Sequence, residues 1–116
     1  MTDLSNSFRI AVNASKEVIL QILINKYKTI SNVSKDTKYF VLKNNNVVIN
    51  ENEDFDAVLA LEDEDAYLYY ENNLDFYPEE TDLNINEQIV LARELFMLFK
   101  DNNIAAEIIA EFEHLI

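Results

Sequence analysis

Apolar and polar positions near the start of the chain follow two different periods. Over 8–13, apolar residues alternate with polar or small ones, which predicts a half-buried strand. Ser15 suits a helix N-cap, and the apolar residues after it recur at helical spacing. We therefore expect a strand over 8–13 and a helix over 16–29, followed by a polar loop over 31–38.

Short apolar runs separated by Asn-rich or acidic segments fill the middle of the chain. Their composition predicts five strands, the third of them central in the sheet: 39–43, 47–49, 57–61, 66–71 and 74–77. The chain has no glycine, and we expect asparagine to take the turn positions because it tolerates positive φ well. The asparagines at 44–46 therefore predict a hairpin turn, and Asn72 with Asn73 predicts a second turn.

The C-terminal third begins with a strong helical pattern and ends ambiguously. Asn84 or Asn86 can cap a helix that runs to about residue 101, where the asparagine pair 102–103 ends it. The segment 104–116 fits an amphipathic strand and also fits a helix. The length of its alternation favours the strand.

These elements follow the order β-α-β-β-β-β-β-α-β, with the last element a strand or a helix. A run of adjacent strands between two helices predicts an α+β fold. We expect a mostly antiparallel sheet of about five to six strands, with both helices packed on one face. The chain of 116 residues is long enough for one hydrophobic core and too short for two, so we expect a single globular domain over 1–116.

Missing residue types exclude several kinds of chemistry. There is no cysteine, which excludes disulfides, thiolate–zinc sites and catalytic thiols. The absence of glycine excludes the usual Gly-rich phosphate loops, and the lone histidine, His114, lies near the end of the chain in no catalytic context. We therefore predict no catalytic residue, no metal site and no cofactor, and we expect that the protein is not an enzyme.

The N-terminal residues 1–7 lack both the basic region and the apolar region of a signal peptide. The longest apolar runs are only a few residues, whereas a membrane span needs about 20. We therefore expect a cytoplasmic protein that does not bind membranes.

Charge is distributed unevenly along the chain, whose net charge is −13. Residues 1–43 carry seven basic and three acidic side chains, whereas residues 44–116 carry two basic and 19 acidic ones. Between Glu51 and Asp82 there are 13 acidic residues and no basic one. Such asymmetry points to an interaction surface for a basic partner and argues against direct nucleic-acid binding.

Tyrosines lie beside these carboxylates in the predicted strands. Leu68, Tyr70, Leu74 and Phe76 are expected to face the core, which would turn the alternate residues outward. Tyrosine is enriched at protein interfaces, and carboxylates beside it attract lysine and arginine of a partner. The expected partner-binding residues are Glu51, Asp54, Asp56, Glu62, Asp63, Glu64, Asp65, Tyr67, Tyr69, Glu71, Asp75 and Tyr77. The alternative is that the acidic loops are a solvated surface and the tyrosines are packing residues.

The sequence leads to one main hypothesis and two alternatives. A small, strongly acidic chain without catalytic residues is typical of bacterial immunity proteins and antitoxins, which neutralise a basic, nucleic-acid-acting enzyme such as a toxin or nuclease. The first alternative is a phage-encoded inhibitor or DNA mimic that blocks a host defence or repair enzyme. The second is a structural module that forms a homodimer through the sheet edge at 39–50.

Overall fold

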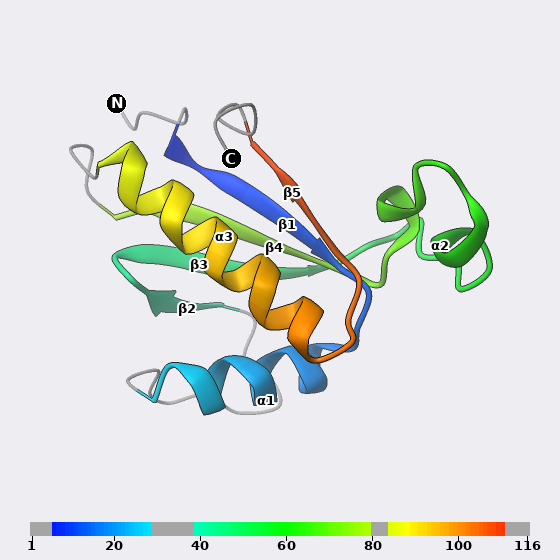
Figure 1. The fold of residues 1–116 in the computed structure, drawn as a ribbon, viewed down its shortest axis with the longest axis horizontal. Helices are drawn as coiled ribbons and strands as arrows, with labels where there is room; N and C mark the ends of the chain where they lie inside the picture. The colour runs from blue at the N-terminus through cyan, green and yellow to red at the C-terminus, as the bar shows by residue number, and fades with distance from the viewer. Residues whose placement is uncertain (1–5, 29–38, 80–83, 111–116) are drawn as a thin grey trace.

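The computed structural model describes residues 6–28, 39–79 and 84–110 (Figure 1). These residues form five strands, three α-helices and one 3₁₀ helix. In chain order they are β1 (Phe8–Val12), α1 (Lys16–Lys26), β2 (Tyr39–Leu42), β3 (Asn45–Glu51), α2 (Leu59–Glu62), the 3₁₀ helix η2 (Ala66–Tyr69), β4 (Asn72–Pro78), α3 (Ile85–Asp101) and β5 (Ala106–Ile109).

The five strands form one sheet in the order β2-β3-β4-β1-β5, and every neighbouring pair is antiparallel. The predicted α+β class is therefore confirmed. The register between β1 and β4 sets Phe8 opposite Phe76, and their rings stack with centroids 4.4 Å apart. The pair lies in the buried core, so this contact aligns the two central strands where the register matters most.

One face of the sheet forms the core together with α1 and α3. Alternate residues on the strands, such as Ile10, Val47 and Leu74, are fully buried, as are Leu23 of α1 and Phe99 of α3. Figure 1 shows α3 running across the sheet and α1 lying near β2. The expectation that both helices pack on one face holds, and no α-helix among the described residues covers the opposite face.

The predicted helix caps are present. The Ser15 hydroxyl accepts a hydrogen bond from the Val18 N–H at 3.3 Å, and the Asn84 side chain accepts one from the Asn86 N–H at 2.7 Å. Each satisfies a backbone donor that has no partner inside the helix. The first helix ends at Lys26, a little earlier than expected, and residues 31–38 lie outside the described residues.

Asparagine takes some of the turn positions expected of it. The β2–β3 hairpin turns through Lys43 (φ 50°) and Asn44 (φ 63°), and positive φ at both central residues suits the twist of a two-residue hairpin. Asn103 (φ 60°) ends α3 in the same way. The hairpin turn is tighter than predicted, because 45–46 already belong to β3.

The predicted turn at Asn72 and Asn73 is wrong, because both residues lie within β4. Asn72 is buried, and its side-chain amide donates a hydrogen bond to the Ala14 carbonyl at 2.8 Å. A partly buried hydrogen bond to a residue 58 positions away therefore fixes this asparagine in the strand. The local turn preference is overridden by a tertiary contact.

Two predicted strands are also wrong. The run 57–61 was expected to be a central strand, but α2 covers most of it, and its Ala and Leu content suits a helix as well as a strand. The segment 66–71 forms the 3₁₀ helix η2 and the approach to β4. In consequence Leu68, expected in the core, is 50% exposed, whereas Leu74 and Phe76 are buried as predicted.

A pair of buried amides joins the hairpin to α3. Asn45 and Gln88 exchange two side-chain hydrogen bonds, of 3.0 and 2.9 Å. Their remaining donors reach the Lys43 and Asn6 carbonyls, at 3.0 and 2.8 Å. Because each buried amide donor has a partner, the pair fixes the position of α3 over the sheet at little desolvation cost.

The C-terminal ambiguity is resolved in part. Residues Ala106–Ile109 form β5, which pairs with β1 at one edge of the sheet, so the strand interpretation is right there. Residues 111–116 lie outside the described residues.

Candidate functional site

Residues 52–71 leave the sheet after β3 and return to it at β4. Figure 1 shows this segment, with α2, projecting beyond the end of the sheet. We call residues 52–71 the acidic excursion, because it contains no lysine or arginine. Its acidic residues are Glu53, Asp54, Asp56, Glu62, Asp63, Glu64, Asp65 and Glu71.

Asn52 fastens the two ends of the acidic excursion together. Its backbone N–H donates to the Glu71 carbonyl at 3.0 Å. Its side-chain amide donates to the carbonyls of Leu68 (2.9 Å) and Tyr70 (2.7 Å). One asparagine therefore ties the start of the excursion to three positions at its end.

Two of the predicted site carboxylates also shape the excursion from within. The Asp56 carboxylate accepts hydrogen bonds from the Val58 and Leu59 N–H groups, at 2.9 and 3.0 Å, at the start of α2. The Asp63 carboxylate accepts one from the Asp65 N–H at 2.8 Å. These contacts turn short acidic stretches into defined turns.

The excursion exposes large apolar side chains among its carboxylates. Phe55 is 44% exposed, Val58 58%, Leu61 80% and Leu68 50%. Val58 and Leu61 are three residues apart at α2, so their side chains lie on the same side of that turn. Exposed apolar residues rimmed by charge are typical of a surface that another protein covers.

The predicted site residues of this region are brought together at the excursion. Glu51 is exposed at the end of β3, and Asp54, Asp56 and the carboxylates of 62–65 follow along the projecting segment. Tyr67 and Tyr69 are half-buried in η2, rather than outward-facing on a strand.

Tyr70, expected in the core, is half-buried, and burial raises the pKa of its hydroxyl, with Glu107 adding to the rise. The 3₁₀ helix η2 contacts β1, so the end of the excursion that returns to β4 lies against the sheet. The two most exposed apolar side chains of the excursion, Leu61 and Val58, lie at α2.

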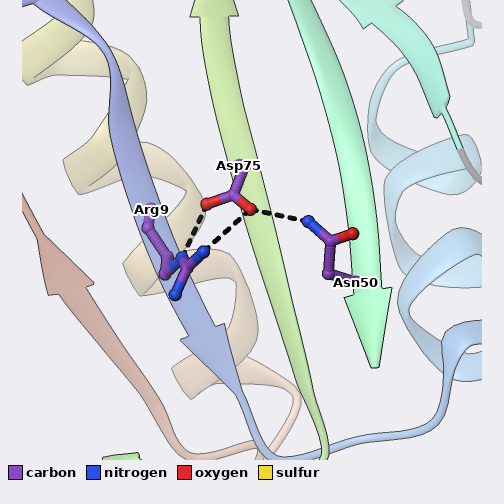
Figure 2. Close-up of polar contacts among 3 residues, drawn as sticks. All are labelled: Arg9, Asn50 and Asp75. Atoms are coloured by element: carbon purple, nitrogen blue, oxygen red, sulfur yellow. Dashed lines mark hydrogen bonds and ion pairs between the residues drawn. The ribbon is translucent and has the colours of Figure 1, made fainter. Parts of the chain in front are cut away.

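Asp75 and Tyr77 lie apart from the excursion, on the sheet face opposite α1 and α3. The Asp75 carboxylate is buried and accepts hydrogen bonds from Arg9 Nε (2.6 Å), Arg9 Nη2 (3.1 Å) and Asn50 Nδ2 (2.7 Å), as Figure 2 shows. The hydrogen bond to Asp75 raises the pKa of the Arg9 guanidinium. Asp75 is therefore neutralised within the chain and does not join the candidate surface, whereas Tyr77 is 41% exposed.

Sequence reasoning missed the apolar part of the surface. The sequence pattern predicts a linker or strands at its residues, Phe55, Val58, Leu61 and Leu68. The one sequence feature that could have indicated exposure is that they stand among acidic residues with no basic residue nearby. It also missed Asn52, whose role depends on carbonyl groups 16 and 18 positions away.

Three other features of the described residues bear on function: metal ligands, cavities and membrane-spanning helices. No group of three or more potential metal ligands occurs there. A cavity of about 450 Å³ lies between the hairpin turn and α3, lined by residues that include Lys43, Asn86 and Glu94. Among the residues that the structure describes, no helix has both the length and the apolar character needed to cross a bilayer.

Comparison with protein-family models, with curated proteins and with solved structures finds no match to this chain.

Proposed function

We propose that this chain is an acidic protein-binding inhibitor that neutralises a basic, nucleic-acid-acting enzyme, in the manner of bacterial immunity proteins and antitoxins. The observation that carries the proposal is the acidic excursion. It projects from the sheet, contains no basic residue, and exposes apolar side chains between its carboxylates. We place this activity in the cytoplasm, where nucleic acid and such an enzyme would meet.

The carboxylates supply attraction and the apolar residues supply lasting contact. An enzyme that acts on nucleic acid has a cationic site for phosphates, and the excursion would occupy it with carboxylates instead. Long-range attraction between opposite charges raises association rates by roughly 10- to 1,000-fold at low salt. Burial of Leu61 and its apolar neighbours would then slow dissociation, because desolvated anchors carry most of the binding energy at protein interfaces.

The shape of the chain favours this inhibitor over a DNA mimic. Its principal extents are 41 × 33 × 26 Å, with a radius of gyration of 13.8 Å, close to the roughly 13 Å expected of a compact chain of this length. A duplex mimic would spread carboxylates along an elongated body. Here eight of them are concentrated in one projecting segment of 20 residues.

Affinity capture with a charge-neutralised variant tests the proposal. The variant replaces the four consecutive carboxylates of the excursion by isosteric amides: Glu62→Gln, Asp63→Asn, Glu64→Gln and Asp65→Asn. Asp63→Asn keeps the acceptor that bonds the Asp65 N–H. A matched control removes four exposed carboxylates elsewhere: Glu79→Gln, Glu87→Gln, Glu94→Gln and Asp101→Asn.

We expect the wild-type chain to retain a basic protein at low salt and to release it in a salt gradient. The excursion variant should retain much less, with the association rate reduced by about tenfold or more, and the control should behave like wild type. Equal losses in the two variants would show that net charge alone drives capture. Undiminished capture by the excursion variant would refute the proposed binding surface.

A further inference from the structure

The sheet face opposite the helices carries an apolar patch that the proposed inhibition does not use. Tyr39 is 75% exposed, Val41 53%, Tyr77 41% and Ile109 36%, and Val48 beside them is half-buried. We call these five residues the open-face patch. No described helix covers it, because α1 and α3 both pack against the other face.

The strand register places the patch in two neighbouring rows. The first row crosses all five strands in the order Tyr39, Val48, Asp75, Arg9 and Ile109. The second row is Val41, Asn46 and Tyr77. The second row lies next to the hairpin turn and the first crosses the middle of β3 and β4, whereas the acidic excursion leaves and re-enters the sheet at the end away from that turn.

The residues of the edge strand β2 do not themselves protect it against pairing. All four residues of β2, Tyr39–Leu42, are apolar. Leu42 and Asn45 close the two-residue turn, so the hydrogen-bonded and non-hydrogen-bonded pairs alternate from there along β2 and β3. Tyr39 and Val41 therefore occupy non-hydrogen-bonded positions, and their backbone N–H and C=O groups point away from the sheet. Proteins commonly protect such an edge with charged side chains, and here the exposed positions hold Tyr and Val instead.

Charge decides what occupies this face. In the two rows of the patch, the only charged side chains are Arg9 and Asp75, which neutralise each other at 2.6 Å. A basic partner drawn by the net charge of −13 would gain no electrostatic attraction here. A second copy of the chain, which is equally acidic, can approach over these two rows, and Glu107, exposed on the same face of β5, marks where the neutral area ends.

We propose that the β2 edge, together with Tyr39 and Val41 of the open-face patch, is the surface through which two copies of this chain associate. The contact is isologous, so each copy offers the same tyrosines and valines to the other. The acidic excursions remain outside the contact, at the far end of each sheet.

The two surfaces should respond to salt in opposite directions. Added salt screens the repulsion between two copies of charge −13, so self-association through a neutral apolar patch should strengthen. Binding of a basic protein to the acidic excursion should weaken under the same conditions. The proposed dimer therefore does not depend on the proposed inhibition and can be tested without any partner.

Sedimentation of the purified chain over a wide concentration range, with and without added salt, tests the proposal. Val41→Lys places a charge in the patch, and Val90→Lys, on the exposed side of α3, makes the same substitution at a similarly exposed valine (53% and 59%). We expect a dimer whose dissociation constant falls with salt. Val41→Lys should raise that constant by at least about tenfold, and Val90→Lys should leave it within about twofold.

Three results would overturn the proposal. The chain could remain monomeric at every concentration and salt. The Val90→Lys control could weaken the dimer as much as Val41→Lys does. A dimer could instead be broken by Leu61→Lys in the acidic excursion, with Val41→Lys having no effect. Circular dichroism of each variant confirms folding, which these exposed positions should leave intact.

Discussion

Arg9 should be far more important to stability than a surface arginine, because the Asp75 carboxylate depends on it. The Asp75 side chain is 8% exposed and the Arg9 side chain 46% exposed. Replacing Arg9 by Met removes two of the three hydrogen bonds to Asp75 and its only countercharge among the described residues. The buried carboxylate then keeps one neutral donor, Asn50 Nδ2 at 2.7 Å.

The expected loss lies between two known limits. Breaking a buried ion pair costs about 3–5 kcal/mol, whereas an exposed pair contributes roughly 0–1 kcal/mol. Arg9 is partly open to water, which would hydrate the abandoned carboxylate to some extent, so we expect Arg9→Met to lower the free energy of unfolding by about 2–3 kcal/mol. Asp75→Asn should cost only about 1 kcal/mol, because the half-exposed guanidinium of Arg9 can turn to water.

Urea unfolding followed by circular dichroism measures both costs. With a slope of about 1.5 kcal/mol per molar urea, Arg9→Met should lower the midpoint by roughly 1.5 M, and Asp75→Asn by less than half of that. Equal costs for the two variants, or a loss below about 1 kcal/mol for Arg9→Met, would refute the argument from unequal burial.

Two further perturbations act on single named contacts. Asn52→Asp sets a carboxylate against the Leu68 and Tyr70 carbonyls. Amide hydrogen exchange should therefore speed up roughly 5- to 30-fold within the acidic excursion and stay unchanged in β1. Equal acceleration in both regions would contradict the role given to Asn52. Burial and the hydrogen bond to Glu94 raise the pKa of the Tyr27 hydroxyl above its ordinary value of 10.0, so the native state keeps this proton at a pH where the unfolded chain loses it. The free energy of unfolding should therefore fall as pH rises above about 10. In urea titrations between about pH 9 and pH 11, Tyr27→Phe should make this fall less steep. An unchanged dependence of stability on pH would show that Tyr27 does not cause the fall.

Long periodic segments and local caps could be predicted from the sequence. The helix that begins after Asn84 has both a capping side chain and an apolar face that recurs over many turns, and α3 has the predicted bounds. Ser15 and the hairpin turn near Asn44 carry the same kind of local information. In each case the residues that decide the structure lie within a few positions of one another.

The middle of the chain could not be predicted in this way. The run 57–61 is too short for its period to separate strand from helix, and Asp56 caps a helical turn there. Because neither 57–61 nor 66–71 forms a strand, β3 and β4, which flank these runs in the sequence, pair directly with each other. Local patterns do not show which strands will find a partner.

The candidate site shows the same division. The concentration of carboxylates was visible in the sequence, because it needs only counting. The burial of Asp75 was not, since it depends on Arg9, 66 positions earlier, and on Asn50 in a third strand. The exposed apolar residues of the acidic excursion could be recognised only when the segment was seen outside the sheet.

The most direct test of the proposed inhibition is a titration of the captured basic enzyme's activity on nucleic acid. The wild-type chain should abolish that activity at about one inhibitor per enzyme, and the excursion variant should need at least about tenfold more at low salt. The difference should shrink as salt is added, because the screened attraction no longer distinguishes the two chains. An enzyme that stays fully active while saturated with the wild-type chain would contradict the inhibitor function.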